Sequence, residues 1–226
     1  DVKVTAVKRR AKYILIEIES SHHLLLHLGM SGSLRISAPE EGLRKHDHLV
    51  FHLSSGMEMR YHDPRRFGCA LWVGADFETH SLFKKLGPEP LSADFSLSYF
   101  TDHCAQRDKA IKQHIMDNAV VVGVGNIYAC ESLHIAGIHP SRSAGKTSKA
   151  RLKTLHHAIR MVLARAIEQG GTTLRDFLHS DGQPGYFQQQ LAVYGREGEA
   201  CSSCQSIIKR ITQGQRSTFY CPKCQR

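Results

Sequence analysis

Four cysteines near the end of the sequence constrain its fold more than any other feature. They form two C-x-x-C pairs, Cys201-Ser-Ser-Cys204 and Cys221-Pro-Lys-Cys224, with sixteen residues between the pairs. Thiolates spaced in this way can bind one Zn²⁺ in a tetrahedral site of four sulfur ligands, and metal binding folds a segment too small for its own core. Four protein ligands leave no open coordination position. The spacing therefore predicts a single structural zinc, and catalysis has to reside elsewhere.

Disulfide bonds are the alternative for these cysteines. We expect thiolates instead, because the opening stretch has no apolar run flanked like a secretory signal and thiols inside cells stay reduced. The spacer between the pairs is predicted to form a hairpin that presents an arginine to nucleic acid. Its polar residues are Arg210, Gln213, Gln215 and Arg216.

The composition favours a polyanion as the partner. Thirty Lys and Arg against 21 Asp and Glu give a net charge of +9, and 41% of the 226 residues are hydrophobic, which is ample for a packed core. No apolar run approaches the roughly 18 residues of a membrane span, so we expect no membrane partner and a bacterial cytoplasmic location at the nucleoid. The cysteines without ligand spacing are predicted to be small buried hydrophobic residues: Cys69, Cys104 and Cys130.

The first third of the chain has the pattern of an antiparallel sheet or sandwich. Short runs rich in branched side chains cover residues 13–19, 22–28, 33–37 and 48–61, and Ser54-Ser55-Gly56 interrupts the last of them. The loops between these runs carry Met30 and residues 65–67. Pro88 and Pro90 then mark a connection to a second region.

Helical signals dominate from about residue 97 to residue 170. One apolar stripe at helical spacing is predicted to be core, and it consists of Leu152, Leu155, Ile159, Val162, Leu163, Ala166 and Ile167. Upstream, one helix is predicted to end near Met116 and a second to cover residues 127–136, with Asn126 as its N-cap and Gly137 as its stop.

Gly123 and Gly125 lie just before the second of these helices. They allow close approach of the backbone to a ligand, and the helix N-terminus that follows is suited to a phosphate group. A dinucleotide is excluded, because no third glycine follows at the required offset and the motif joins two helices. A nucleic-acid backbone is the better ligand.

Five motifs occur in order along the chain. They are Arg9-Arg10-Ala11-Lys12-Tyr13, His27-Leu28-Gly29-Met30-Ser31-Gly32, Asp63-Pro64-Arg65-Arg66-Phe67-Gly68, Val122-Gly123-Val124-Gly125-Asn126-Ile127-Tyr128 and the hairpin with four cysteines. Together they make the chain resemble bacterial formamidopyrimidine-DNA glycosylase, the 8-oxoguanine repair enzyme, over essentially all 226 residues.

The resemblance implies an α+β multidomain fold. Residues 1–90 would form a partial N-terminal antiparallel β-sandwich lobe, residues 91–196 a helical lobe with a helix-two-turn-helix motif, and residues 197–226 the zinc-finger hairpin. Double-stranded DNA would lie in the cleft between the lobes, and we expect a monomer. The segment from Gly171 to Phe187 matches the loop that covers the flipped base, although an ordinary surface loop is an equal alternative.

The resemblance also implies roles for particular residues. Met30, Arg65 and Phe67 would enter the duplex where the damaged nucleotide has left the stack, whereas without the resemblance the two apolar side chains would be assigned to the core. Lys12 and Arg216 would assist the elimination steps. The remaining contacts to DNA would come from His46, Arg65, Arg107, Lys112, Asn126 and Arg216, for which solvated surface charge is the alternative.

One family feature has no match here. The family's nucleophile is an N-terminal proline with a glutamate beside it, and Asp1 does not align with that proline. We expect the 226 residues to be part of a longer, complete enzyme, with a naturally shortened protein as the alternative. We expect impaired catalysis from the 226 residues alone.

The implied activity is removal of oxidised purines, chiefly 8-oxoguanine and formamidopyrimidines, followed by β- and δ-elimination at the abasic site. Three alternatives stay open. The chain could be a non-catalytic damaged-DNA-binding module, a glycosylase of the endonuclease VIII branch acting on oxidised pyrimidines, or an RNA-binding zinc-ribbon protein.

Overall fold

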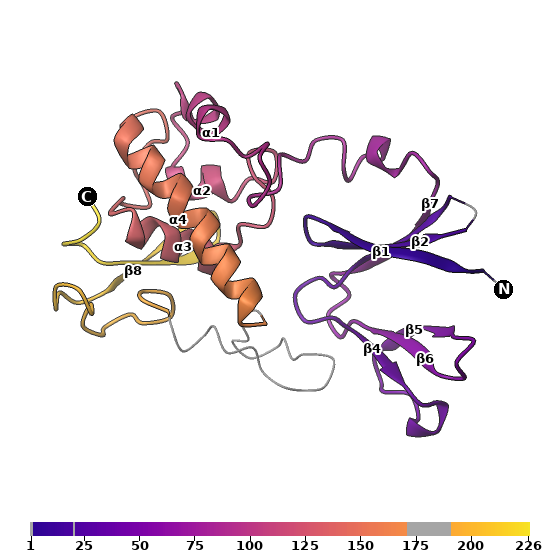
Figure 1. The fold of residues 1–226 in the computed structure, drawn as a ribbon. Coiled ribbons are helices and arrows are strands. Elements are labelled where there is room, and N and C mark those ends of the chain that lie inside the picture. The colour runs from indigo at the N-terminus through magenta and orange to yellow at the C-terminus, as the bar shows by residue number, and fades with distance from the viewer. Residues whose placement is uncertain (1, 20, 171–190) are drawn as a thin grey trace. The chain divides into compact units, whose positions relative to one another are not determined.

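The computed structural model describes residues 2–19, 21–170 and 191–226, which fold into two compact units (Figure 1). The first unit holds the described residues up to Phe83, together with Gln169 and Gly170. The second unit holds Lys84–Glu168 and residues 191–226. The predicted division into a β region and a later helical region is confirmed, because every helix longer than a single turn in the described residues lies in the second unit.

Two antiparallel sheets build the first unit. The strand order is β1-β2-β3-β7 in one sheet and β4-β6-β5 in the other. The strands are β1 Val4–Arg10, β2 Tyr13–Ile18, β3 His23–His27, β4 Ser33–Ser37, β5 Asp47–His52, β6 Glu58–His62 and β7 Cys69–Val73. Ile16, Leu26 and Tyr61 form a buried cluster that joins the two sheets.

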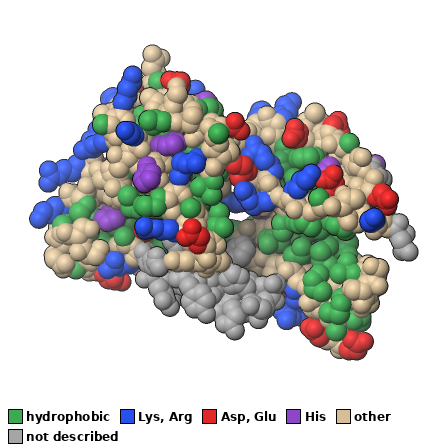
Figure 2. Space-filling view, viewed as in Figure 1, with side chains coloured by type: hydrophobic (Ala, Val, Ile, Leu, Met, Phe, Trp, Pro, Cys, Tyr) green, Lys and Arg blue, Asp and Glu red, His purple; other side chains and the backbone are tan. Residues whose placement is uncertain are grey.

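The smaller sheet has one apolar and one polar face. In its register Leu34 and Leu49 both lie opposite Tyr61, whereas Arg35 lies opposite Arg60. Part of the apolar face stays open, with Ile36 and Leu49 exposed, and Figure 2 shows hydrophobic side chains gathered on the surface of this unit. The period-2 alternation of the sequence is therefore present, with ion pairs on one side and packing on the other.

The interruption predicted at Ser54-Ser55-Gly56 separates β5 from β6, and Gly56 has a φ of 79° in that turn. The sequence pattern did not predict β1. This strand is the edge of its sheet and most of its residues are exposed, so it lacks the apolar run by which a strand is recognised.

Four helices surround the core of the second unit. They are α1 Leu97–Cys104, α2 Ile111–Ile115, α3 Asn126–Ile135 and α4 Lys149–Glu168. The predicted stripe on α4 is buried from Leu152 to Ala166, which confirms it as core. Ile167 is exposed, so its assignment to the core was wrong. It lies in the last turn of α4, beyond Leu163, where the main core cluster ends.

Gly125, and not Asn126, occupies the N-cap position of α3. The prediction was wrong because the Asn126 carboxamide is engaged in tertiary hydrogen bonds, to Lys112 among others, and does not cap its own helix. The predicted stop is confirmed: Ala136 is the C-cap and Gly137 follows with a φ of 64°.

Strands β8 Lys209–Gln213 and β9 Arg216–Tyr220 form the hairpin near the end of the chain. The cysteine end of the hairpin packs on the helices through a buried cluster of Cys130, Val193, Cys201, Ile208 and Cys221. Across the described residues, no helix is both long and apolar enough to cross a membrane.

Candidate nucleic-acid interface

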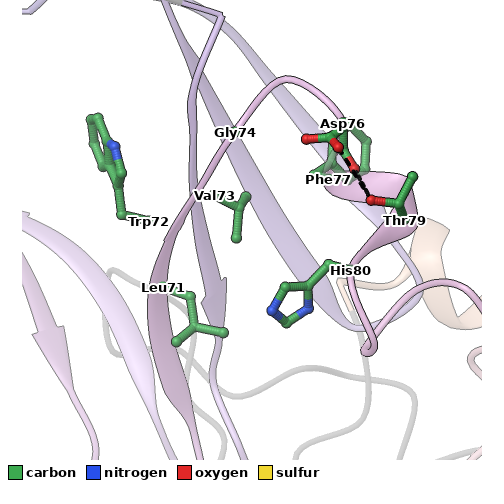
Figure 3. A pocket seen from close by; sticks show the side chains of 8 residues that line it. All are labelled: Leu71, Trp72, Val73, Gly74, Asp76, Phe77, Thr79 and His80. Atoms are coloured by element: carbon green, nitrogen blue, oxygen red, sulfur yellow. Dashed lines mark hydrogen bonds between the residues drawn. The ribbon is translucent and has the colours of Figure 1, made fainter.

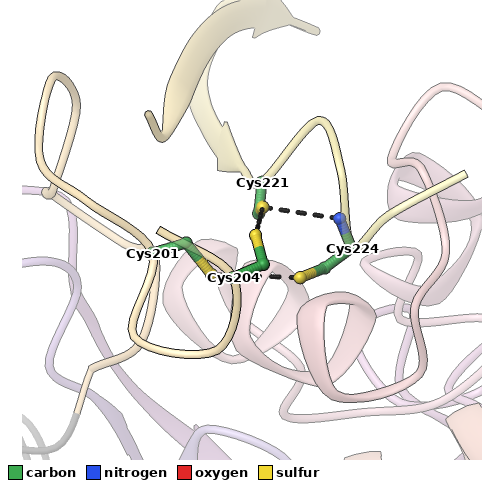
Figure 4. Close-up of side chains that lie close together, drawn as sticks. All are labelled: Cys201, Cys204, Cys221 and Cys224. Atoms are coloured by element: carbon green, nitrogen blue, oxygen red, sulfur yellow. Dashed lines mark hydrogen bonds between the residues drawn. The ribbon is translucent and has the colours of Figure 1, made fainter. Parts of the chain in front are cut away.

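The hairpin brings the four predicted zinc ligands together. The Sγ atoms of Cys201, Cys204, Cys221 and Cys224 all lie within 4.8 Å of one another (Figure 4). All four are free thiols in the structure, so the disulfide alternative is not supported. Four converging thiols with C-x-x-C spacing are the donor set of a closed structural zinc site. Of the other cysteines, Cys104 and Cys130 are buried as predicted and Cys69 is half-buried.

The zinc hairpin presents Arg216 to solvent. Gly214 and Gln215 both have positive φ and make the turn, so that Arg216 begins β9 with an exposed side chain. Two other polar side chains of the spacer are engaged with protein: Gln213 Nε2 donates to Pro140 O at 3.3 Å, and Arg210 pairs with Glu197 at 2.8 Å. The hairpin thus leaves one arginine at its tip for a ligand.

Lys112 and Asn126 meet beneath the hairpin. Lys112 Nζ donates to Asn126 Oδ1 at 2.5 Å and to Thr218 Oγ1 at 2.6 Å, and Asn126 Nδ2 donates to Ser217 O at 2.9 Å. Lys112 is only 1% exposed, and burial together with the nearby Arg216 cation lowers its pKa. The sequence predicted both residues as direct DNA contacts. In the structure, the lysine fastens α2 and α3 to β9, next to Arg216.

Glu131 is a buried residue of this unit that the sequence did not reveal. Its carboxylate accepts three backbone N–H groups, from Ala192 at 2.8 Å, Val193 at 3.0 Å and Tyr194 at 2.9 Å. These bonds attach the segment leading into the zinc hairpin to α3. The only sequence signal is a single acid on the buried face of a predicted helix.

The Gly-x-Gly turn leads into α3 as predicted. Gly123 has a φ of 84° and open space where a side chain would stand, and Gly125 is the N-cap. Arg107 is exposed in the loop after α1, and its carbonyl accepts Gly145 N at 2.8 Å. The described contacts do not join Arg107 to the Lys112 group.

Met30, Arg65 and Phe67 are exposed on two loops of the first unit. Met30 is 54% and Phe67 62% exposed, so the core alternative for these two residues is wrong. The Arg65 guanidinium carbon lies 5.9 Å from the Phe67 ring centroid, and Arg65 Nε donates to Ser31 Oγ at 3.1 Å. Exposed large apolar side chains next to a cation suit a ligand that offers stacking surface.

The two loops are fastened to each other. Tyr61 OH donates to His27 O at 2.9 Å and joins them, and within the second loop Asp63 Oδ2 accepts Gly68 N at 2.8 Å. A Cβ on Gly29 would lie 2.7 Å from Gly68 N, so both loops need glycine where they pass. The three exposed side chains are therefore displayed from one rigid frame.

Lys12 and His46 lie in the same unit as this frame. Lys12 is exposed in the turn between β1 and β2, where Ala11 has a φ of 52°. Tyr13 pairs with His27 in the register of β2 and β3, so Lys12 lies near the start of the Met30 loop. Burial lowers the pKa of His27, and the Lys12 cation lowers it further. His46 O accepts Asp63 N at 3.0 Å, so the His46 loop is joined to the Arg65 loop as well.

A pocket of about 320 Å³ lies along β7 and the turn after it, lined by residues that include Trp72, Phe77 and His80 (Figure 3). It contains none of the predicted site residues. The segment from Gly171 to Phe187, which was predicted to cover the flipped base, lies outside the described residues.

Three protein-family descriptions match the chain. The N-terminal domain of formamidopyrimidine-DNA glycosylase matches residues 1–70, its H2TH domain residues 86–178, and the zinc finger found in FPG and IleRS residues 198–226. The matches follow the chain in the order predicted for the β lobe, the helical lobe and the hairpin.

Curated relatives and solved structures of the same family are also similar to this chain. The formamidopyrimidine-DNA glycosylase of Alcanivorax borkumensis is 57% identical over 226 residues, covering all of this chain and 83% of that protein, and the Thioalkalivibrio sulfidiphilus protein is 57% identical over 97% of this chain and 81% of its own. The crystal structure of MutM (Fpg) from Thermus thermophilus superposes with a TM-score of 0.91 at 37% identity, covering 99% of this chain and 83% of its own.

Lactococcus lactis Fpg in complex with abasic-site DNA superposes with a TM-score of 0.93 at 34% identity, covering 100% of this chain and 83% of that one. Both the sequence identity and the overlap in length far exceed what a shared fold alone requires. The chain therefore belongs to the formamidopyrimidine-DNA glycosylase family.

Proposed function

We propose that this protein is a base-excision repair glycosylase that removes oxidised purines, such as 8-oxoguanine and formamidopyrimidines, from duplex DNA. Family membership supports the proposal, as do the solved complexes of related proteins with abasic-site DNA and with Fapy-dG DNA. The observation that carries it is the exposed group of Met30, Arg65 and Phe67 on two loops that are fastened together.

These side chains suit the gap left by a base that has swung out of the helix. A stacked base hides its glycosidic bond, so the enzyme has to extrude the nucleotide and offset an unstacking cost of a few kcal/mol. Met30 would fill the gap, Phe67 would enter between neighbouring base steps, and Arg65 would donate to the orphaned partner base. His46, Arg107, Asn126 and Arg216 would bind phosphates, with Lys112 supporting Asn126.

The extrusion step can be tested by titrating lesion-bearing and intact duplexes that carry a fluorescent reporter base beside the lesion. We expect lesion-specific binding with a fluorescence change, and a loss of about fivefold or more in lesion affinity for Phe67→Ala, since stacking on an aromatic ring contributes about 1–3 kcal/mol. Ile36→Ala is the matched control, because Ile36 is as exposed as Met30 but lies on β4. Equal affinity for both duplexes would refute the proposal.

The proposed reaction continues with strand cleavage at the abasic site. An amine attacks the sugar C1′ as the base leaves, and the resulting Schiff base allows β- and δ-elimination, in which the Lys12 and Arg216 cations stabilise the leaving phosphates. Borohydride trapping reports the amine. We expect no adduct from the 226 residues, since none of their amines matches the family's proline. An adduct that disappears in Lys12→Gln would instead make Lys12 the nucleophile.

A further inference from the structure

A buried carboxylate on the polar face of the smaller sheet holds a histidine in a fixed orientation. The Asp47 side chain is fully shielded from solvent and accepts hydrogen bonds from both terminal nitrogens of Arg35, from Arg44 N at 2.8 Å and from His62 Nδ1 at 2.9 Å. Burial opposes ionisation of Asp47, but these hydrogen bonds outweigh it and hold its pKa well below the usual value. Asp47 is therefore ionised near neutral pH.

This contact determines which ring nitrogen of His62 is available to a ligand. An ionised carboxylate only accepts hydrogen bonds, so Nδ1 carries a proton whatever the charge of the ring. The other nitrogen, Nε2, has no hydrogen-bond partner among the described residues, and the side chain is 19% exposed. Nε2 accepts when the ring is neutral and donates when it is an imidazolium. The fixed ring thus presents one titratable position to the surroundings.

Two further histidines lie close to His62. The His46 ring lies 5.9 Å from the His62 ring and 6.1 Å from the His48 ring, and His48 Nε2 lies 3.0 Å from Asp63 O. The charged and titratable groups around His62 are Asp47 and His48 on β5, Arg35 on β4, His46 before β5, and Asp63 next in the chain. Asp47 is paired with Arg35, and the Asp63 carboxylate accepts Gly68 N. A phosphate group placed beside His62 would therefore lie next to imidazole rings.

We propose that His62 is a second phosphate-binding residue, which donates Nε2–H to the DNA backbone beside His46, and that Asp47 and Arg35 are positioning residues for it. The inference rests on the proposed function. A neutral His62 cannot donate from Nε2 while Nδ1 holds its proton for Asp47, so the contact exists only in the imidazolium form. Protonation of the ring makes the contact, and deprotonation removes it.

The variant His62→Asn separates the contact from the fold. The asparagine amide can donate to Asp47 in place of Nδ1, while the Nε2 position is removed. We expect lesion-duplex affinity to fall about tenfold at about pH 6 and to change little at about pH 8, since a hydrogen bond to a charged group contributes about 1.5–3 kcal/mol. The slope of log affinity against log salt should become shallower by about 0.9 at the lower pH.

His52→Asn is the matched control. His52 also lies beside a carboxylate across the same pair of strands, with Nδ1 3.3 Å from Glu58 Oε1, but it stands at the other end of the ladder and is 81% exposed. We expect its binding curves to superpose on those of the wild type at both pH values. A second variant, His62→Gln, keeps a neutral donor near the Nε2 position and should bind with little dependence on pH.

The outcomes distinguish this inference from the function on which it rests. If the wild-type protein does not prefer the lesion duplex, the proposed function fails. If it does, but His62→Asn and His62→Gln keep the wild-type affinity, salt slope and pH dependence, the role of His62 is refuted and the proposed function stands. Thermal unfolding of each variant shows whether it is folded, and wild-type pH dependence in either folded variant overturns the inference.

Discussion

Replacing Glu131 by glutamine should destabilise the helical unit more than its small change in shape suggests. The carboxylate of Glu131 is buried in α3, with Oε1 accepting the N–H groups of Val193 and Tyr194 and Oε2 accepting that of Ala192. Every backbone donor in this group faces an oxygen. In Glu131→Gln, one of the two oxygens becomes an NH2 group that faces a donor.

The magnitude follows from counting these contacts. If the glutamine oxygen still accepts the N–H groups of Val193 and Tyr194, these two hydrogen bonds lose their charged acceptor. Each then contributes about 1 kcal/mol less to stability. The N–H of Ala192 is left without an acceptor, which costs about 1–3 kcal/mol. The expected loss in free energy of unfolding is about 3–5 kcal/mol, a large part of the stability of an ordinary domain.

The two units permit a selective assay. In the part of the chain that the structure describes, all four α-helices belong to the second unit, so helical circular dichroism in a urea titration follows that unit. The single tryptophan, Trp72, lies on β7 and reports the first unit. We expect Glu131→Gln to lower the midpoint of the circular dichroism transition and to leave the Trp72 transition in place.

Glu199→Gln is the control for this prediction. Glu199 lies in the same unit and pairs with Arg196 at 2.8 Å, but its side chain is exposed, so the expected change is below about 1 kcal/mol. A loss in Glu131→Gln no greater than that of the control would refute the reasoning, because it would mean that the three N–H groups find other acceptors at no cost.

Three further predictions concern the loops, the metal and acid. Gly68→Ala should abolish lesion-specific binding in the duplex titration, because the added Cβ would collide with Tyr61 OH and His27 O. Gly74→Ala is the control and should bind normally, because its Cβ would have only an ordinary contact 3.4 Å away. Removing zinc with a chelator should unfold the hairpin and withdraw Arg216, so unchanged lesion affinity in metal-free protein would count against that role. The pKa of Asp47 is lower in the folded than in the unfolded protein, so its ionised carboxylate stabilises the fold above the unfolded-state pKa of about 3.9. This stabilisation is lost as pH falls below that value. Asp47→Asn should therefore make stability, measured by Trp72 fluorescence, less dependent on pH in acid.

The parts of the site that the sequence could predict are those specified by local spacing. Two C-x-x-C pairs identify the zinc ligands because each pair is a single turn of backbone. The stripe on α4 identifies the core because its period is that of a helix. Met30 and Phe67 are different, since an apolar side chain is by default buried. The strand pattern placed both in loops, and only the resemblance to a known family gave them a role in the DNA duplex.

The parts that could not be predicted depend on pairings across long distances in the chain. Glu131 meets its three donors about sixty residues further on, and Lys112 reaches Thr218 more than one hundred residues away. A polar residue on a helix gives no indication of such a partner before the fold is known. The N-cap assigned to Asn126 failed for the same reason, because tertiary bonds outcompeted the local one.

A β-bulge explains why the Asp47–His62 pair was also missed. Simple alternation along His46-Asp47-His48 would place the two histidines on one face of β5 and the acid on the other. In the structure Leu49 lies opposite Tyr61 but Asp47 lies opposite His62, so the register shifts by one residue and His48 is the extra residue. The shift turns the acid toward His62 and Arg35. Deleting His48 would make Asp47 and Leu49 adjacent, so ordinary alternation would still place Leu49 opposite Tyr61 and Asp47 opposite His62. The pH-dependent part of DNA binding should therefore survive this deletion, and its loss would show that the extra residue itself orients His62.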